Sequence, residues 1–309
     1  MSDVLILGPQ FRAPNLREAL AAAGVSGALA AVTAGWQERE GELAALEEHI
    51  GRRVPDLRLY ERAEAVFARD PELRAAYRAR QDELRRMQEL YRVRLAHAKA
   101  AVRELFAEDD RSAPMRAARR AALAALRRLD DAHLRGIERV HARFDAQWRP
   151  GGRPALAREK EDLARALGPA RAVCLAGGPV AALLNRLRLF GLGQLLGGRT
   201  VVAWSAGAMA LAQRVVLFHD HPPQGAGDAE VFESGLGLVR ATVFLPHAAA
   251  RLALGDRERV ALLARRFSQA ACLTLDDGSL LHWQRERLVA GADVRRLTRS
   301  GATVAVTLR

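Results

Sequence analysis

The chain has 309 residues, half of them hydrophobic, and 48 Lys and Arg side chains against 36 Asp and Glu give a formal net charge of +12. This apolar content suffices for one large core or two modest ones, but no apolar run approaches the roughly 18 residues that a membrane helix needs. The N-terminus lacks the basic start and long apolar segment of a signal peptide, so we expect a soluble, cytoplasmic protein with no membrane partner. Cys174 and Cys272 are too few for a disulfide framework and lie in apolar runs typical of buried free thiols.

The N-terminal segment alternates between strand and helix patterns. Apolar runs predict strands at 4–7, 28–32 and 57–60, and amphipathic spacing predicts helices at 15–23 and 38–50. This alternation is typical of a parallel sheet with crossover helices.

Two long helical patterns then interrupt the alternation. Apolar residues at three- and four-residue spacings predict helices over 71–106 and 115–148, and the polar turn between them offers Ser112 as an N-cap and Pro114 for the first turn. We expect these helices to form an antiparallel hairpin, inserted as residues 62–152.

Positive charge is concentrated in this insertion. Residues 76–150 hold 18 basic and 11 acidic side chains, which is more than half of the net charge. Because the two signs are interleaved, and no zinc-finger spacing, RNA-stacking motif or basic tail occurs, the pattern favours a solvated surface over a nucleic-acid site. A homodimerisation arm and a partner-docking arm both remain open as functional interpretations.

The strand and helix alternation resumes after the hairpin and ends in an antiparallel region, where Asp276-Asp277-Gly278-Ser279 predicts a hairpin turn. The helices predicted here are 155–167, 180–190, 206–213 and 256–267, and the clearest strands are 172–176, 200–203, 215–218, 241–245 and 304–308. The predicted fold class is therefore α/β, with a mostly parallel sheet flanked by helices in a discontinuous domain of residues 1–61 and 153–309.

One serine stands between a buried strand and a helix, in Val-Val-Ala-Trp-Ser-Ala-Gly-Ala. Ser205 in this setting is typical of a nucleophile elbow, where small neighbours permit a strained turn that lifts the hydroxyl above the sheet edge. The N–H of Ala206 would then lie at a helix N-terminus and could stabilise an oxyanion. Ala203 replaces the first glycine of Gly-x-Ser-x-Gly, and a serine that merely caps a helix explains the pentapeptide equally well.

A second turn, Gly177-Gly178-Pro179, follows the preceding strand. In a parallel sheet this turn would face Ser205 across the C-terminal strand ends, where binding sites collect. We expect the amide of Gly178 to be the second oxyanion donor, and Gly177 and Pro179 to line the substrate site. An ordinary strand-to-helix turn is the alternative.

A serine nucleophile needs a base, and the base needs an orienting acid. His247 ends an apolar strand in Val-Phe-Leu-Pro-His and suits the base. Asp220 is the expected acid, with Glu230 and Glu233 as alternatives.

We expect no catalytic or metal-binding role for the other downstream histidines. His219 and His221 would suit a metal, but no cysteine or clear carboxylate completes a zinc pattern, so we expect no metal. His282, beside a tryptophan in a strand, is predicted to pack in the core.

The ordered set of Gly-Gly turn, Trp-Ser-Ala-Gly-Ala elbow, acid loop and strand closing in Pro-His resembles the dipeptidase E and cyanophycinase group of serine peptidases, in the class I glutamine amidotransferase-like superfamily. The resemblance covers about residues 170–285 and leaves the hairpin outside. It implies a flavodoxin-like sheet, no cofactor, and the roles of nucleophile for Ser205, base for His247, acid for Asp220 and oxyanion donor for Gly178. A glutaminase of this superfamily would instead carry cysteine at the elbow.

The same resemblance bears on the substrate. Arg251 matches an arginine near the substrate of cyanophycinase-like enzymes, and a guanidinium suits a carboxylate, although a surface arginine is the alternative. Pro179 and Val180 stand where the peptidases have Asn or Gln, so one polar substrate contact is missing. The sequence thus predicts a serine hydrolase for small peptides or amides, aspartyl peptides among them. The competing interpretation is a non-catalytic scaffold whose basic hairpin binds a partner.

Overall fold

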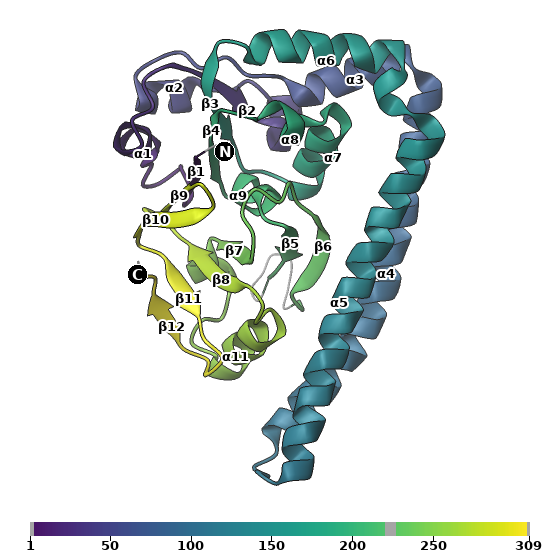
Figure 1. The fold of residues 1–309 in the computed structure, drawn as a ribbon, viewed down its shortest axis with the longest axis vertical. Coiled ribbons are helices and arrows are strands. Elements are labelled where there is room, and N and C mark those ends of the chain that lie inside the picture. Colours follow the sequence, from purple (N-terminus) through teal and green to yellow (C-terminus); the bar gives the residue numbers. More distant parts are fainter. Residues whose placement is uncertain (1–2, 220–226, 308–309) are drawn as a thin grey trace.

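The body of the protein is built around a six-stranded sheet, seen in the computed structural model, which describes residues 3–219 and 227–307 (Figure 1). The strand order is β10-β9-β1-β4-β3-β2, in which β1, β4, β3 and β2 run parallel and β9 and β10 are antiparallel. The strands are β1 (Val4–Leu7), β2 (Ala28–Val32), β3 (Ala170–Leu175), β4 (Thr200–Trp204), β9 (Leu280–Gln284) and β10 (Arg287–Ala292). The predicted α/β class with a mostly parallel central sheet is confirmed.

Both faces of this sheet are covered. In β1, Val4 and Ile6 join the larger core, whereas Leu5 and Leu7 join a smaller one, which is why the strand is apolar throughout rather than alternating. The smaller core includes residues of α1 (Leu16–Ala22) and is flanked by α2 (Ala44–Ile50). The larger core lies under α3 (Leu59–Arg69), α6 (Pro154–Leu167), α7 (Val180–Phe190) and α8 (Leu192–Leu195).

A second, smaller sheet lies beyond the carboxyl ends of the first. Its order is β12-β11-β8-β7, and β7 and β8 are parallel. A two-stranded antiparallel ribbon of β5 and β6 lies beside it. The elements of this region are β5 (Arg214–Leu217), β6 (Glu230–Ser234), β7 (Thr242–Pro246), β8 (Ala271–Leu275), β11 (Arg295–Leu297), β12 (Thr303–Ala305), α9 (Ala206–Leu211), α10 (Ala248–Arg251) and α11 (Arg257–Arg266).

The helical hairpin consists of α4 (Pro71–Ala107) and α5 (Ala113–Trp148). At 37 residues, α4 spans about 55 Å. Ser112 caps α5 by accepting a hydrogen bond from the Met115 N–H, as the turn sequence predicts. The hairpin lies along the body beside β6, and its tip extends past α11 (Figure 1).

One carboxylate closes the base of the hairpin. Asp70 caps α4 through the N–H of Leu73 and also pairs with Arg153, whose Nη2 lies 2.6 Å from its Oδ1. Arg153 directly precedes α6, so the hairpin leaves and rejoins the body at the same place. The guanidinium of Arg153 holds the pKa of Asp70 below its ordinary value.

The predicted strand at 57–60 is wrong. Residues from Leu59 onward form α3, with Leu59, Ala63, Val66 and Phe67 buried at helical spacing. A four-residue apolar run fits either element, and here the longer helical pattern decides.

Two further local predictions need correction. The segment 38–50 is a 3₁₀ turn, η1 (Ala34–Arg39), followed by α2, because Gly41 adopts a φ of +88° that breaks the helix. The 276–279 turn exists, with the Ser279 N–H donating to the Asp276 carbonyl. It is not a hairpin, however, since the strands on either side, β8 and β9, belong to different sheets.

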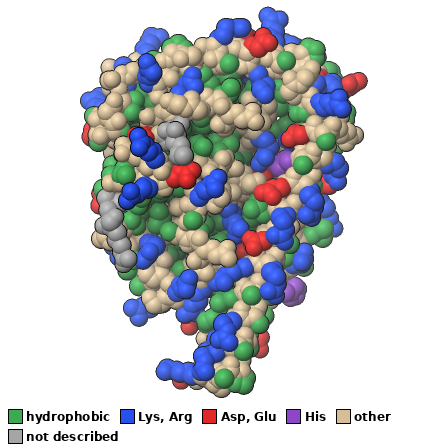
Figure 2. Space-filling view, in the orientation of Figure 1, with side chains coloured by type: hydrophobic (Ala, Val, Ile, Leu, Met, Phe, Trp, Pro, Cys, Tyr) green, Lys and Arg blue, Asp and Glu red, His purple; other side chains and the backbone are tan. Residues whose placement is uncertain are grey.

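Basic side chains are spread over the visible face of the body and the hairpin, with acidic ones among them (Figure 2). Many of the hairpin arginines are paired with carboxylates, for example Arg85 with Asp82 and Arg143 with Glu83. In the described ranges, no helix combines the length and apolar character needed to cross a membrane.

Candidate active site

Ser205 occupies a sharp turn between β4 and α9. Its φ of 51° and ψ of −121° lie in a region that non-glycine residues rarely adopt, which is the strain expected of a nucleophile elbow. The neighbours must be small for this turn to form. A Cβ on Gly207 would lie 2.3 Å from the Leu175 carbonyl oxygen, and one on Gly177 would lie 2.8 Å from the Ser205 Cβ.

His247 meets Ser205 from the second sheet. It follows the buried strand β7 with φ 57° and ψ 38°, and its N–H donates to the Leu275 carbonyl of the adjacent strand β8. These constraints place Nε2 at 3.1 Å from the Ser205 Oγ, within hydrogen-bond reach.

The surroundings favour the neutral form of His247. Burial lowers its pKa first, and the positive charge of Arg251 lowers it further, whereas Asp276 and Asp277 act in the opposite direction and only in part. A neutral imidazole at neutral pH can accept the proton of the serine hydroxyl.

The Gly177-Gly178 turn lies directly beside the elbow, as the sequence predicts for a second oxyanion donor. The Cβ position of Gly177 is 3.6 Å from the Ala206 nitrogen, so the two turns bring their backbones together. Gly178 has a φ of +104° and packs on Gly35, where a side chain on either residue would clash with backbone atoms. Pro179 is the N-cap residue that directly precedes α7.

The candidate acid Asp220 lies outside the described residues. Its alternatives, Glu230 and Glu233, are directed at the hairpin rather than toward the candidate base. Glu230 accepts hydrogen bonds from Gln88 and Arg92, and a Glu233 oxygen lies 2.9 Å from Nε2 of His141.

Two carboxylates of the 276–279 turn contribute to the electrostatics of the site. Asp276 and Asp277 follow β8 and raise the pKa of His247. Asp276 also accepts a hydrogen bond from the Ala249 N–H, two residues after the histidine. The sequence does carry a signal for these carboxylates, which is an apolar strand followed by two Asp residues. That signal points to His247 only once the parallel pairing of β8 with β7 is known.

Arg251 is exposed to solvent, and its guanidinium has no hydrogen-bond or ion-pair partner among residues 3–219 and 227–307. Partial desolvation by the surrounding chain lowers its pKa. It is held one helical turn from His247, whose carbonyl accepts the Arg251 N–H. An unpaired guanidinium in this position could bind a carboxylate.

The other candidates are the remaining downstream histidines and the two cysteines. His221 is outside the described residues, and the ring of His219 stacks on Phe218. His282 is buried in β9 with Nε2 at 3.5 Å from an Asp3 oxygen, which agrees with a packing role. The described part of the chain holds no group of three or more metal-ligating side chains. Both cysteines are buried and free, as predicted.

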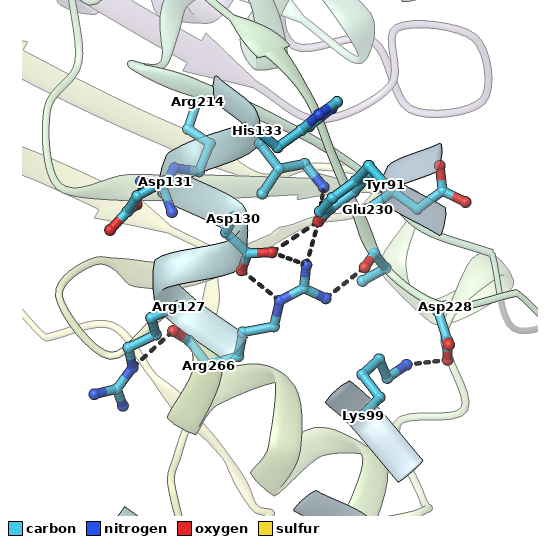
Figure 3. Close-up of polar contacts among 12 residues, drawn as sticks. Tyr91, Lys99, Arg127, Asp130, Asp131, His133, Arg214, Asp228, Glu230 and Arg266 are labelled. Carbon is cyan, nitrogen blue, oxygen red and sulfur yellow. Dashed lines mark hydrogen bonds and ion pairs between the residues drawn. The ribbon is translucent and has the colours of Figure 1, made fainter. Parts of the chain in front are cut away.

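A buried polar network joins the hairpin to the chain that leads into β6 (Figure 3). Arg266 of α11 donates to both oxygens of Asp130 on α5 at 2.7 Å, to the Tyr91 hydroxyl of α4 and to the Ala229 carbonyl. The Tyr91 hydroxyl in turn accepts from the Val231 N–H. Thus α11 and α4 bond this stretch of backbone directly, and α5 fixes both side chains through Asp130.

Asp228 extends the same attachment (Figure 3). It pairs with Lys99 and Arg103 of α4, and burial lowers the pKa of Lys99 to about 8. The hairpin thus fixes the chain immediately after the segment that contains Asp220.

No family model matches this chain, and neither does any curated protein sequence. Among solved structures, a peptidase from an acI-B1 Actinobacterium aligns over 99% of this chain and 97% of its own, at 13% identity and a TM-score of 0.46. A protein from Listeria monocytogenes EGD-e, proposed to be a Peptidase E, aligns over 45% of this chain and 65% of its own, at 15% identity and a TM-score of 0.31. Neither likeness is close enough to assign the chain to a family.

Proposed function

We propose that this protein is a serine hydrolase, a peptidase or amidase that acts on small peptides through an acyl-enzyme. The observation that carries the proposal is the 3.1 Å contact between the Ser205 Oγ and the His247 Nε2, made by a serine in the strained conformation of an elbow. A serine that only capped α9 would need neither the strain nor the histidine, and the Ser205 side chain makes no capping hydrogen bond.

The reaction follows from these positions. The Ser205 Oγ attacks the carbonyl carbon of the scissile bond while His247 Nε2 takes the hydroxyl proton. The amides of Gly178 and Ala206 stabilise the oxyanion, and His247 returns the proton to the leaving amine as the C–N bond breaks. Water then attacks the acyl-enzyme, again giving its proton to His247, and the free acid leaves. No cofactor takes part in these steps.

Arg251 points to the substrate class. Its solvent-accessible guanidinium is near enough to the base to lower the pKa of His247 and has no protein partner among the described residues, so a substrate carboxylate is a suitable ligand. Peptides with an aspartyl residue at the scissile bond are therefore the first to test.

A fluorophosphonate probe tests the nucleophile directly. Intact-mass measurement should show one probe per chain, lost in Ser205→Ala and strongly slowed in His247→Gln. Ser300→Ala, at an exposed serine near the C-terminus, is the matched control and should label like the parent. Labelling that persists in Ser205→Ala would refute the proposal.

The identity of the acid needs its own comparison. Asp220 is the prediction from the sequence, and Asp276 and Asp277 are the described carboxylates that act on His247. Asn variants at the three positions should reveal one with a much larger loss of labelling rate than the other two. The orienting acid is that residue.

The alternative of a non-catalytic scaffold has less support. A scaffold would tolerate another side chain between Ser205 and His247, whereas here the two lie in contact. Arg92, Lys99 and Asp130 of the hairpin are paired with residues of the body, so these groups are not free to bind a partner.

A further inference from the structure

The loop between β1 and α1 carries the most exposed large apolar side chain of the described residues. Phe11 is 93% exposed, although nothing in the packing of the fold requires an aromatic ring there. A single exposed apolar side chain is ordinary on a protein surface, so the exposure of Phe11 matters only because of where its loop lies.

This loop lies at the same sheet edge as Ser205. Strands β1 and β4 are parallel with Leu7 opposite Trp204, so Gly8 follows at the level of Ser205. Phe11 comes three residues later.

The loop is tied down rather than loose. The Gln10 side chain donates to the Gly8 carbonyl and to the Asn15 side chain, and Asn15 Nδ2 donates to the Gly278 carbonyl. The Gly8 N–H donates to the Ser279 carbonyl. Phe11 is therefore presented by a loop held against the 276–279 turn, and little ordering cost would accompany a contact with a ligand.

These attachments place Phe11 on a particular side of the nucleophile. The oxyanion donor Gly178 belongs to the β3 side of Ser205, whereas β1 and the 276–279 turn lie on the other side. His247 also belongs to that other side, because its N–H bonds to Leu275 at the start of the turn. The histidine must protonate the leaving amine, so the leaving portion of the substrate lies toward the loop that carries Phe11.

We propose that Phe11 contacts an apolar side chain of the leaving residue, so that the enzyme prefers peptides with a hydrophobic residue on the C-terminal side of the scissile bond. This inference rests on the proposed function and adds to it the preference on the leaving side. Because the leaving residue is gone once the acyl-enzyme forms, the contact affects acylation and leaves the hydrolysis of the acyl-enzyme unchanged.

The test compares two dipeptides that share the acyl residue, Asp-Leu and Asp-Gly. The parent should cleave Asp-Leu with the higher kcat/KM, and Phe11→Ala should lower that value about tenfold while changing Asp-Gly little. Phe11→Leu should restore most of the loss, since it keeps an apolar contact. Leu90→Ala, which removes another exposed apolar side chain far away on α4, is the matched control and should change neither substrate.

The outcomes separate the two proposals. If the parent cleaves both peptides and Phe11→Ala changes them equally or not at all, the contact is refuted and the hydrolase stands. If the parent cleaves neither peptide and fluorophosphonate fails to label Ser205, the hydrolase and the contact are refuted together. If labelling succeeds without cleavage of either peptide, the leaving-side preference stated here is refuted and the nucleophile stands.

Discussion

Removing the carboxylate of Asp130 should be among the most destabilising single changes in the hairpin. Asp130 and Arg266 are each about 1% exposed at the side chain and share two hydrogen bonds of 2.7 Å. Asp130→Ala leaves the guanidinium in the interior without its counter-charge, and breaking a buried pair in this way typically costs about 3–5 kcal/mol of unfolding free energy.

The neighbouring residue provides a matched control. Asp131 pairs with Arg214 at 2.7 Å, but the two side chains are 40% and 29% exposed. Asp131→Ala should therefore cost no more than about 1 kcal/mol, since solvent screens an exposed pair.

Urea unfolding followed by tryptophan fluorescence would measure both variants, with the denaturant slope checked for constancy. The double variant Asp130→Leu with Arg266→Met should regain part of the loss, because it removes the unpaired charge, while the Ala229 carbonyl and the Tyr91 hydroxyl still lose their partners. Equal losses in the two single variants, or a double variant no better than Asp130→Ala, would contradict this account of the network.

Three further outcomes follow from the site and the hairpin. Gly177→Ala should slow fluorophosphonate labelling about 100-fold, because its Cβ would lie 2.8 Å from the Ser205 Cβ and displace the nucleophile; a labelling time course measures this. The labelling rate should rise with pH through a midpoint below about 6.5, since burial and Arg251 favour neutral His247, and Arg251→Gln should move that midpoint upward in a pH series. Arg80→Met should leave the urea unfolding free energy within about 1 kcal/mol of the parent, because this 5%-exposed guanidinium has two buried nitrogens without a hydrogen-bond partner among the described residues; a loss near that of Asp130→Ala would contradict it.

Periodicity and capping residues predicted the long elements well. The hairpin helices have enough turns for their apolar spacing to be unambiguous, and Ser112 and Pro114 mark where the second begins. The short run at 57–60 was misassigned because four residues cannot distinguish a strand from the first turn of a helix whose buried positions continue to Phe67.

The pairing of Ser205 with His247 was expected because each residue follows an apolar strand. The two strands, β4 and β7, belong to different sheets, so the contact depends on how the sheets meet, which no local pattern gives. The electrostatic contribution of Asp276 could not be anticipated either. It depends on β8 pairing in parallel with β7, a long-range contact that a local turn pattern hides. The contacts of Glu233 with the hairpin were hidden for the same reason, since they join residues 92 positions apart.

The ion pair between Asp70 and Arg153 joins the two ends of the hairpin, so the hairpin could be replaced as a unit. Because the two ends of the insertion meet, a short linker could bridge them without rerouting the rest of the chain, and an exchange of hairpins between related proteins would face no geometric obstacle at this point. What such an exchange would have to reproduce lies further along, where Asp228 and Glu230 take their partners from α4. The two ends of the insertion could therefore be joined by a linker, whereas its middle is bonded to the body. Substitutions should be tolerated at the tip of the hairpin more readily than at the residues that pair with Asp228 and Glu230.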